Sequence, residues 1–384
     1  MPSMTRVAVN PDLLRWARER ARMDAIELEA RFPKLAHWER REISPTLKQL
    51  EAYARAMHVP IGYLFLPERP EETLPIPDFR TMAGRAVPQP SPNLLDTIYA
   101  CQERQAWYRE FAQVTGQQAL GFVGSVTMQI NPVDAAAGLR EALSFDVDER
   151  RDCRTWTEAL RLFIDQADAL GVLVMVSGVV INNNRRRLDP EEFRGFALAD
   201  ELAPLVFING ADSKAAQMFT LAHELAHVWL RVSALSDAGP ASTPTNATEL
   251  WCNRVAAELL VPLEVFRAEL IADEPIAESL SRHARRFKVS TLVILRRLLD
   301  VGRLSRQEFF RAYEEEVARI AAINRGSGGN FYRTTIARVS RRFARALIES
   351  TLEGRTLYRD AFRMLGIAKT ETFNEFGRSL NFDL

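Results

Sequence analysis

Two histidines and a glutamate in one five-residue run, His223, Glu224 and His227, are the side chains in this sequence best suited to chemistry. Residues four apart share one face of an α-helix, so imidazoles at this spacing can bind the same tetrahedral zinc ion. Glu224 lies just beside that face, where its carboxylate can take a proton from zinc-bound water. The H-E-x-x-H pattern arises by chance in roughly one chain in two hundred of this composition. The sequence therefore predicts a zinc site with Glu224 as the general base.

A buried helix is expected to position this run, and Asp212 or Ser213 can cap its amino-terminal end. A histidine inside such a helix needs a polar partner, which a metal ion supplies. The alternative is a pair of core histidines that are satisfied by protein groups and bind no metal. The apolar neighbours that predict burial are Met218, Phe219, Leu221, Ala222 and Leu225.

A third metal ligand is expected from the next helix, which follows a loop over residues 236–248 and is stopped by Pro262. If this helix packs on the first, Glu249 reaches the zinc, and Asn253 lies one turn behind as a donor that supports the ligands. Glu258 is the competing acidic residue. It lies nine residues after Glu249 and faces elsewhere by helical phase, so Glu249 is favoured.

Two segments resemble the ImmA/IrrE family of zinc metallopeptidases: residues 219–227, Phe-Thr-Leu-Ala-His-Glu-Leu-Ala-His, and residues 249–262, which run from Glu249 to Pro262. The similarity spans roughly residues 150–300 and implies a zincin-like domain with Glu224 as general base. Known members are cytoplasmic endopeptidases that cut a partner helix-turn-helix repressor and so switch on mobile-element, DNA-damage or defence genes. The order of the chain, with an Xre-like amino-terminal domain before the peptidase motifs, is similar to that of members such as CapP, which are associated with anti-phage operons. The zinc ligands that the resemblance implies are His223, His227 and Glu249.

The amino-terminal residues 10–66 are expected to form a compact helical unit. The run that contains Trp38-Glu39-Arg40, Ser44-Pro45-Thr46 and Val59-Pro60 resembles the Xre/Cro-type helix-turn-helix domain. Only residues 33–37 stand where that family has a turn and a recognition helix, and Pro33 restricts them further. A role in protein contact or packing is therefore favoured over sequence-specific DNA binding.

The chain as a whole predicts an α+β fold that is mostly helical. Its 384 residues allow several domains, and 50 basic against 50 acidic residues give no global preference for a charged partner. The strands are expected at residues 171–176, 193–199 and 205–208. The last of these is either an edge strand that pairs with an extended substrate peptide or an ordinary buried strand.

The expected helices, strands and Pro-rich segment divide the chain into four regions. Residues 67–92 contain seven prolines and are expected to be a linker or wrapping segment. The regions are a helix-turn-helix-like domain at 1–70, a Pro-rich linker and helical segment at 71–148, the peptidase domain at 149–310 and a helical carboxyl-terminal region at 311–384.

The three cysteines are expected to be free thiols of a cytoplasmic protein, because no secretory segment precedes them. The longest nearly apolar run, residues 169–180, is too short to cross a bilayer, so no membrane partner is expected. Cys101 has two interpretations. It is either a small buried apolar residue or a thiolate that takes the open zinc position and keeps the enzyme latent.

His283 is the remaining histidine in this half of the chain and a candidate donor to the oxyanion of the reaction, although its basic neighbours favour an exposed position. Residues 282–306 hold eight basic residues and one acidic residue, and residues 325–345 hold six basic and none acidic. These clusters fit a regulatory nucleic acid or a solvated, partner-docking surface.

The sequence thus favours a zinc endopeptidase that cleaves a partner helix-turn-helix repressor. The alternative from another class is a DNA-binding transcriptional regulator with a zinc-stabilised module.

Overall fold

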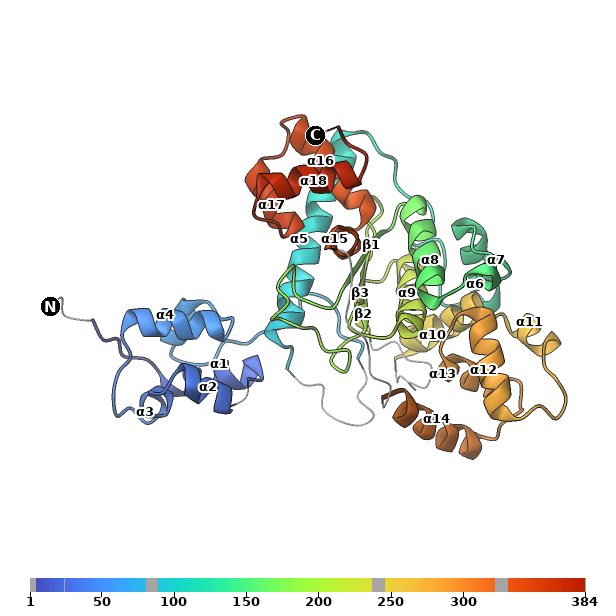
Figure 1. Cartoon of the computed structure of the whole chain (residues 1–384), viewed down its shortest axis with the longest axis horizontal. Helices are drawn as coiled ribbons and strands as arrows, with labels where there is room; N and C mark the ends of the chain where they lie inside the picture. Colours follow the sequence, from blue (N-terminus) through green and yellow to red (C-terminus); the bar gives the residue numbers. More distant parts are fainter. Residues whose placement is uncertain (1–4, 24, 81–88, 237–245, 322–330, 384) are drawn as a thin grey trace. The chain divides into compact units, whose positions relative to one another are not determined.

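The computed structural model describes residues 5–23, 25–80, 89–236, 246–321 and 331–383 (Figure 1). The chain divides into two compact units. The first comprises residues 1–75 and 87–98, and the second comprises residues 76–86 and 99–384. A short part of the Pro-rich segment therefore belongs to the second unit, while the chain on either side of it belongs to the first.

The first unit is helical. Asn10 caps its first helix, and Thr46 and Gln49 form a capping box at the start of its fourth, which fixes where these helices begin. The core is built on Leu14, Trp38 and Tyr53. The helices are α1 (Pro11–Ala21), α2 (Ala25–Arg31), α3 (Leu35–Glu39), α4 (Leu47–Ala56) and the 3-10 helix η1 (Ile61–Phe65).

Helix α3 occupies the place where a recognition helix was not expected to fit. It has five residues, and two of them, Leu35 and Trp38, are buried in the core. The Trp38 ring packs on Phe32 and Tyr53, with ring centroids 6.4 Å away in each case. Such a helix has few side chains left to offer to base edges. The preference for protein contact or packing over DNA binding by this unit stays a prediction.

A mixed four-stranded sheet lies in the second unit, with the order β1-β3-β2-β4. Strand β3 pairs in parallel with β1 and antiparallel with β2, while β4 pairs antiparallel with β2. Of the two alternatives for residues 205–208, the structure shows the buried strand and not the edge strand, because β3 lies between two strands and is buried throughout. The strands are β1 (Leu173–Ser177), β2 (Gly195–Leu198), β3 (Leu205–Asn209) and β4 (Ala234–Ser236).

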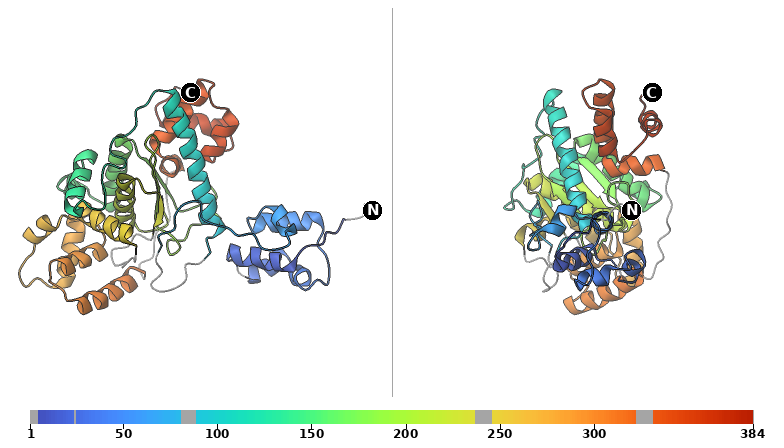
Figure 2. Two further views of the ribbon diagram at one scale, coloured as in Figure 1. Left: turned by 180° about the vertical axis from the view of Figure 1, so that it is seen from behind. Right: turned by 90° about the vertical axis from the view of Figure 1, so that its left-hand side faces the viewer.

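Helices cover both faces of this sheet, as Figures 1 and 2 show, with α8 and α9 on one side and α5 on the other. The fold is thus mostly helical with a small mixed sheet, as expected. The helices before and beside the sheet are α5 (Pro92–Val114), α6 (Pro132–Leu143), α7 (Glu149–Asp152), α8 (Trp156–Leu170), α9 (Lys214–Leu230) and α10 (Ala247–Leu260). The later ones are α11 (Leu263–Ala268), α12 (Ile276–Phe287), α13 (Thr291–Asp300), α14 (Arg306–Ala321), α15 (Phe331–Val339), α16 (Arg341–Leu352), α17 (Tyr358–Leu365) and α18 (Thr370–Ser379).

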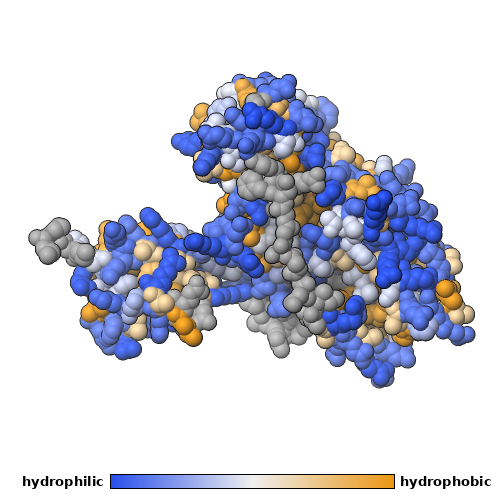
Figure 3. Space-filling view, viewed as in Figure 1, coloured by the Kyte–Doolittle hydropathy of each residue, from blue (hydrophilic) through white to orange (hydrophobic). Residues whose placement is uncertain are grey.

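The surface of the second unit is mostly hydrophilic on the face that Figure 3 shows, with apolar side chains scattered over it. Among the helices of the described ranges, none combines the length and the hydropathy that a bilayer crossing requires.

Candidate metal centre

Helix α9 carries the two histidines into the core. The Ser213 side chain caps it by accepting a hydrogen bond from the Ala216 N–H, so Ser213 rather than Asp212 marks its start. All residues from Gln217 to Trp229 are buried. The helix packs between α8 and α10 and against strands β2 and β3. A helix that is apolar all round is stable only inside such a core.

Helix α10 brings a carboxylate to the same point. The Asn246 side chain caps α10 through the Thr248 N–H, which places Glu249 in the first turn. The Glu249 carboxylate reaches both imidazoles, with Oε2 3.2 Å from His223 Nε2 and Oε1 2.9 Å from His227 Nε2. The two Nε2 atoms are 3.1 Å apart. One carboxylate and two imidazole nitrogens thus converge on one point, and the side-chain exposures of Glu249, His223 and His227 are 2%, 0% and 0%.

These three groups fit a zinc ion. Ligand atoms about 2.0–2.2 Å from a tetrahedral ion lie roughly 3.3–3.6 Å from one another, close to the measured spacings. Burial lowers the pKa of His227, which keeps its imidazole neutral with a lone pair to share. Burial alone would raise the pKa of Glu249, but the two histidines hold it well below its usual value and keep the carboxylate ionised. Two neutral imidazoles and one carboxylate are a ligand set that catalytic zinc commonly has.

Glu224 lies in the same core. Both of its carboxylate oxygens are buried and form no hydrogen bond of ordinary geometry within the described part of the chain, although the Ser236 hydroxyl is near enough to lower the pKa of the carboxyl. Burial, together with the negative charge of Glu249, raises the pKa of Glu224 well above its usual value. A bound dication would oppose this rise, because its charge favours the carboxylate. A carboxyl group tuned in this way is suited to exchange a proton with a reacting group.

Gly195 in β2 makes room for Glu224, and sequence analysis did not identify it. A Cβ atom at this position would lie 2.6 Å from Thr220 Cγ2 and 3.2 Å from Glu224 Oε1. Only a residue without a side chain lets β2 come this close to α9. An isolated glycine inside a predicted strand was the signal that could have found it.

Ser236 at the end of β4 is a second residue that sequence analysis missed. Its hydroxyl is completely buried and donates to Glu249 Oε1 at 3.3 Å, and the same oxygen is 3.3 Å from His227 Nε2. The sequence placed Ser236 at the start of a loop. No local pattern marks it, because its position depends on the pairing of β4 with β2.

The segment Ile76–Arg80, which we call the strap, also borders the centre. Its residue Asp78 pairs in parallel with Leu235 of β4, on the side of β4 away from β2. The Phe79 ring lies beside the imidazole of His227, with centroids 6.2 Å apart. The expectation of a linker or wrapping segment did not anticipate a strand-like contact next to the candidate metal ligands.

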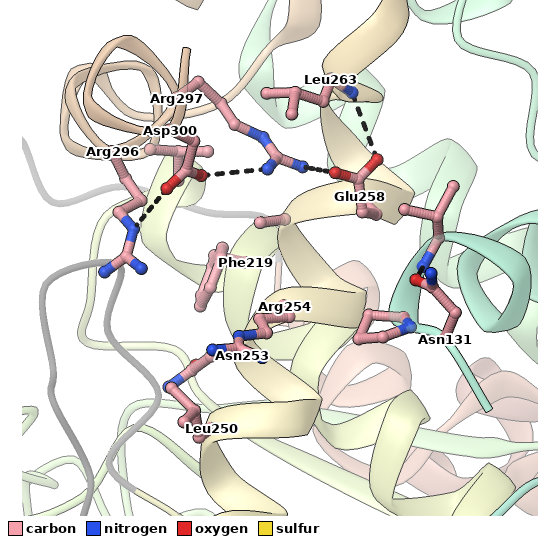
Figure 4. A pocket seen from close by; sticks show the side chains of 14 residues that line it. Asn131, Phe219, Leu250, Asn253, Arg254, Glu258, Leu263, Arg296, Arg297 and Asp300 are labelled. Carbon is pink, nitrogen blue, oxygen red and sulfur yellow. Dashed lines mark hydrogen bonds and ion pairs between the residues drawn. The ribbon is translucent and has the colours of Figure 1, made fainter. Parts of the chain in front are cut away.

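Asn253 and Glu258 lie further along α10. Asn253 lines a pocket of about 350 Å³ together with Phe219 and Leu250 (Figure 4). It lies one helical turn after Glu249 on α10. Glu258 forms an ion pair with Arg297 at 2.9 Å and accepts a hydrogen bond from the Leu263 N–H. Glu258 is therefore engaged away from the histidines, as its helical phase predicted.

Cys101 and His283 are not brought into this group. Within the described ranges, the side chains that can share a metal ion are His223, His227 and Glu249. Cys101 of α5 lies against Met175 of β1, with Sγ 4.0 Å from Sδ, and burial raises the pKa of its thiol to about 12. A small buried thiol accounts for these contacts.

The exposed position expected for His283 is wrong. Its side chain is buried, its Nδ1 lies 2.9 Å from the Ser279 carbonyl oxygen, and its ring packs on Phe266 and Phe287. It sits on the apolar face of α12 with Leu280 and Phe287, so it belongs to the core and not to an oxyanion site.

Many arginines of the basic clusters have partners inside the protein. In the cluster 282–306, Arg282 pairs with Glu274, Arg286 with Glu269 and Asp148, and Arg297 with Glu258. In the cluster 325–345, Arg342 donates to the Tyr108 hydroxyl and Arg345 to the Leu380 carbonyl, while residues 325–330 lie outside the described residues. These contacts give the clusters a structural role, and nucleic-acid contact stays a prediction.

Comparison with known families agrees with the geometry. Residues 167–299 match the family model Peptidase_M78, described as IrrE N-terminal-like domain. This stretch contains the sheet, α9, α10 and all four residues of the centre, and the match supports a metallopeptidase domain of the IrrE type there. Residues 339–379, from the end of α15 through α18, match a domain of unknown function (DUF8813). No curated protein matches the chain.

Proposed function

We propose that the second unit is a zinc-dependent endopeptidase, and that its substrate is a helix-turn-helix repressor whose cleavage derepresses stress, mobile-element or defence genes. The observation that supports the peptidase activity is the convergence of His223, His227 and Glu249 on one buried point, together with the buried carboxyl of Glu224 in the same core. The match of residues 167–299 to a peptidase family model supports it independently.

Each residue of the centre has a distinct part in this proposal. His223, His227 and Glu249 hold the ion. Zinc bound there supplies a Lewis acid that activates water and polarises the scissile carbonyl. Glu224 takes the proton from the attacking water and delivers it to the leaving amine. Its burial excludes competing solvent and lets it pass the same proton from the water to the leaving group.

The repressor substrate is proposed from the sequence resemblance and from the helical first unit. That unit has its own core and a capped set of helices, so it can serve as a module that contacts another protein. Its short α3 favours protein contact over base recognition.

The test is the substitution Glu224→Gln, which keeps the size of the side chain and removes its proton affinity. Cleavage of a co-expressed helix-turn-helix partner, read by intact mass, is expected to fall by about 10²–10⁴-fold. Zinc content, measured on the same protein, is expected to stay at one ion per chain. Undiminished cleavage by the zinc-loaded variant would contradict the proposal.

A further inference from the structure

Strand β4 directs a fourth polar group toward the candidate metal ligands. Ser236 Oγ lies 3.3 Å from His227 Nε2 and 3.3 Å from Glu249 Oε1. These spacings match the roughly 3.3–3.6 Å expected between two ligand atoms of one tetrahedral ion. The Ser236 hydroxyl therefore lies at ligand-to-ligand spacing from two of the three candidate ligands, where it could take the position that a catalytic centre needs for water.

The centre is closed in this conformation. His223, Glu224, His227 and Ser236 are completely buried, and Glu249 is 2% exposed. A peptidase must admit an extended peptide to its ion, and a point with no exposed ligand atom does not admit one. Peptide access therefore requires that some element of the wall moves.

Strand β4 is a short element of the wall at the edge of the sheet. It has three residues, and β2 pairs with all of them, Ala197 with Ala234, Phe196 with Leu235 and Gly195 with Ser236. On its other side the strap supplies the remaining hydrogen bonds. The Leu235 N–H donates to the Pro77 carbonyl and the Phe79 N–H donates to the Leu235 carbonyl, each at 2.9 Å.

Two buried side chains anchor the strap. Ile76 and Arg80 are 7% and 6% exposed, while the residues Pro77 and Asp78 between them are exposed. The Arg80 guanidinium donates to both Asp78 oxygens, at 2.9 and 2.7 Å, and to the Glu192 carbonyl at 3.1 Å. The charge-assisted bonds to Asp78 fix the shape of the strap, and the bond to Glu192 ties the strap to the segment that leads into β2.

We propose that this arrangement is a latent form of the enzyme, in which the Ser236 hydroxyl holds the fourth position of the ion and the strap keeps β4 in place. Release of the strap frees β4 to move, withdraws Ser236 and opens the centre to water and peptide. This inference rests on the proposed metal binding by His223, His227 and Glu249, and it adds the element that restrains the activity.

The position of Ser236 is tested with the substitution Ser236→Cys in protein loaded with Co²⁺. A thiolate at this position is expected to bind the cobalt and to give a thiolate-to-cobalt charge-transfer absorption in the near ultraviolet. The matched control is Ser233→Cys, three residues earlier, where the native hydroxyl accepts a hydrogen bond from the Ala199 N–H. The wild type controls for Cys252, which lies buried on α10 one turn after Glu249.

The outcomes of this experiment are distinct. A charge-transfer band in Ser236→Cys alone supports the inference. Cobalt binding by all three proteins without such a band in Ser236→Cys overturns the inference and leaves the proposed function standing. A wild type that binds no Co²⁺ overturns the proposed function, and the inference with it.

The strap is tested with Arg80→Gln, which removes the buried guanidinium, against Arg69→Gln, an exposed arginine of the same Pro-rich segment. Hydrogen exchange at the Leu235 N–H is expected to quicken at least about tenfold in Arg80→Gln and to stay unchanged in the control. Cleavage of the partner is expected to rise several-fold, and adding Glu224→Gln to Arg80→Gln should abolish the gain. Unchanged exchange, or faster exchange without a rise in cleavage, would overturn the role of the strap.

Discussion

Glu249 is the residue on which the metal centre depends most, because one carboxylate joins two imidazoles that sit on another helix. Glu258, on the same helix, has a different task and pairs with Arg297. Substitutions of the two glutamates can therefore separate the effect of losing a candidate ligand from the effect of losing a structural carboxylate.

We expect Glu249→Gln to weaken zinc binding by at least about a hundredfold, since loss of a group that merely supports a ligand already costs 10–100-fold. Glu258→Gln should leave zinc affinity nearly unchanged and lower stability instead, because Arg297 loses its buried partner. Competition with a chromophoric chelator measures the affinity, and urea unfolding measures the stability. A larger loss of affinity in Glu258→Gln would reverse the assignment.

Gly195 sets how closely β2 approaches the catalytic helix. Gly195→Ala places a methyl group against Thr220 and Glu224, and we expect it to cost about 1–3 kcal/mol of stability and to reduce cleavage further by displacing Glu224. Gly138→Ala in α6 is the control, because a Cβ atom there meets no neighbour within 4 Å and should be neutral or slightly stabilising. Urea unfolding and cleavage rates distinguish the two. If the two variants had the same stability and the same cleavage rate, β2 would tolerate a methyl group at position 195.

At the scale of elements, the sequence predicted those whose signal is local. Helices α9 and α10 follow from caps and apolar periodicity, and β1 and β3 from short apolar runs. The sequence left open whether β3 is an edge strand or a buried one, although four consecutive apolar residues from Leu205 to Ile208 indicate a strand buried on both faces, which is typical of a central strand.

Elements defined by distant pairing were not predictable. The strap is rich in proline and polar residues, and it gains its strand-like character only from Leu235, far along the chain. Strand β4 has three residues, which is too short for a periodic signal. The burial of His283 was predictable in principle, because Leu280, His283 and Phe287 recur at helical spacing. Its neighbours Arg282, Arg285 and Arg286 favoured an exposed position, but they lie on other faces of the same helix.

Arg150 of α7 joins three elements of the second unit. It is completely buried, donates to the carbonyls of Leu260 and Phe287, and places its guanidinium 4.3 Å from the centre of the Phe145 ring. Leu260 and Phe287 are the last residues of α10 and α12, so the positive charge also complements the carboxyl-terminal ends of both helices.

We expect Arg150→Ala to destabilise the second unit by about 2–5 kcal/mol, because it leaves a cavity and two buried carbonyls without their donor. Arg151→Ala is the matched control, since the neighbouring arginine is exposed and should change stability by less than about 0.5 kcal/mol. Urea unfolding followed by tryptophan fluorescence measures both. Similar values for the two variants would contradict the role assigned to Arg150.

On the scale of the whole molecule, the two units have separate hydrophobic cores, one around Leu14 and Tyr53 and one around α9 and α10. Only the second core contains the candidate metal ligands. Ligand binding stabilises the unit that binds it, by about 2.7 kcal/mol at a hundredfold excess over Kd.

Calorimetry of the metal-free chain is therefore expected to show two transitions, of which zinc raises only the one that belongs to the second unit. A chelator should reverse the shift, and Glu249→Gln should remove it. A single transition would show that the two cores unfold as one, and a zinc-induced shift in both transitions would show that zinc stabilises the first unit as well.

The strap affects which fragments of this chain can be expected to stay soluble. A fragment that begins at residue 149, the start of the predicted peptidase domain, would lack Ile76–Arg80 and leave the outer edge of β4 bare. Unpaired strand edges recruit other chains and promote aggregation. The strap thus shields the sheet from intermolecular association, and a fragment made for crystallisation or enzymology should retain it to stay soluble.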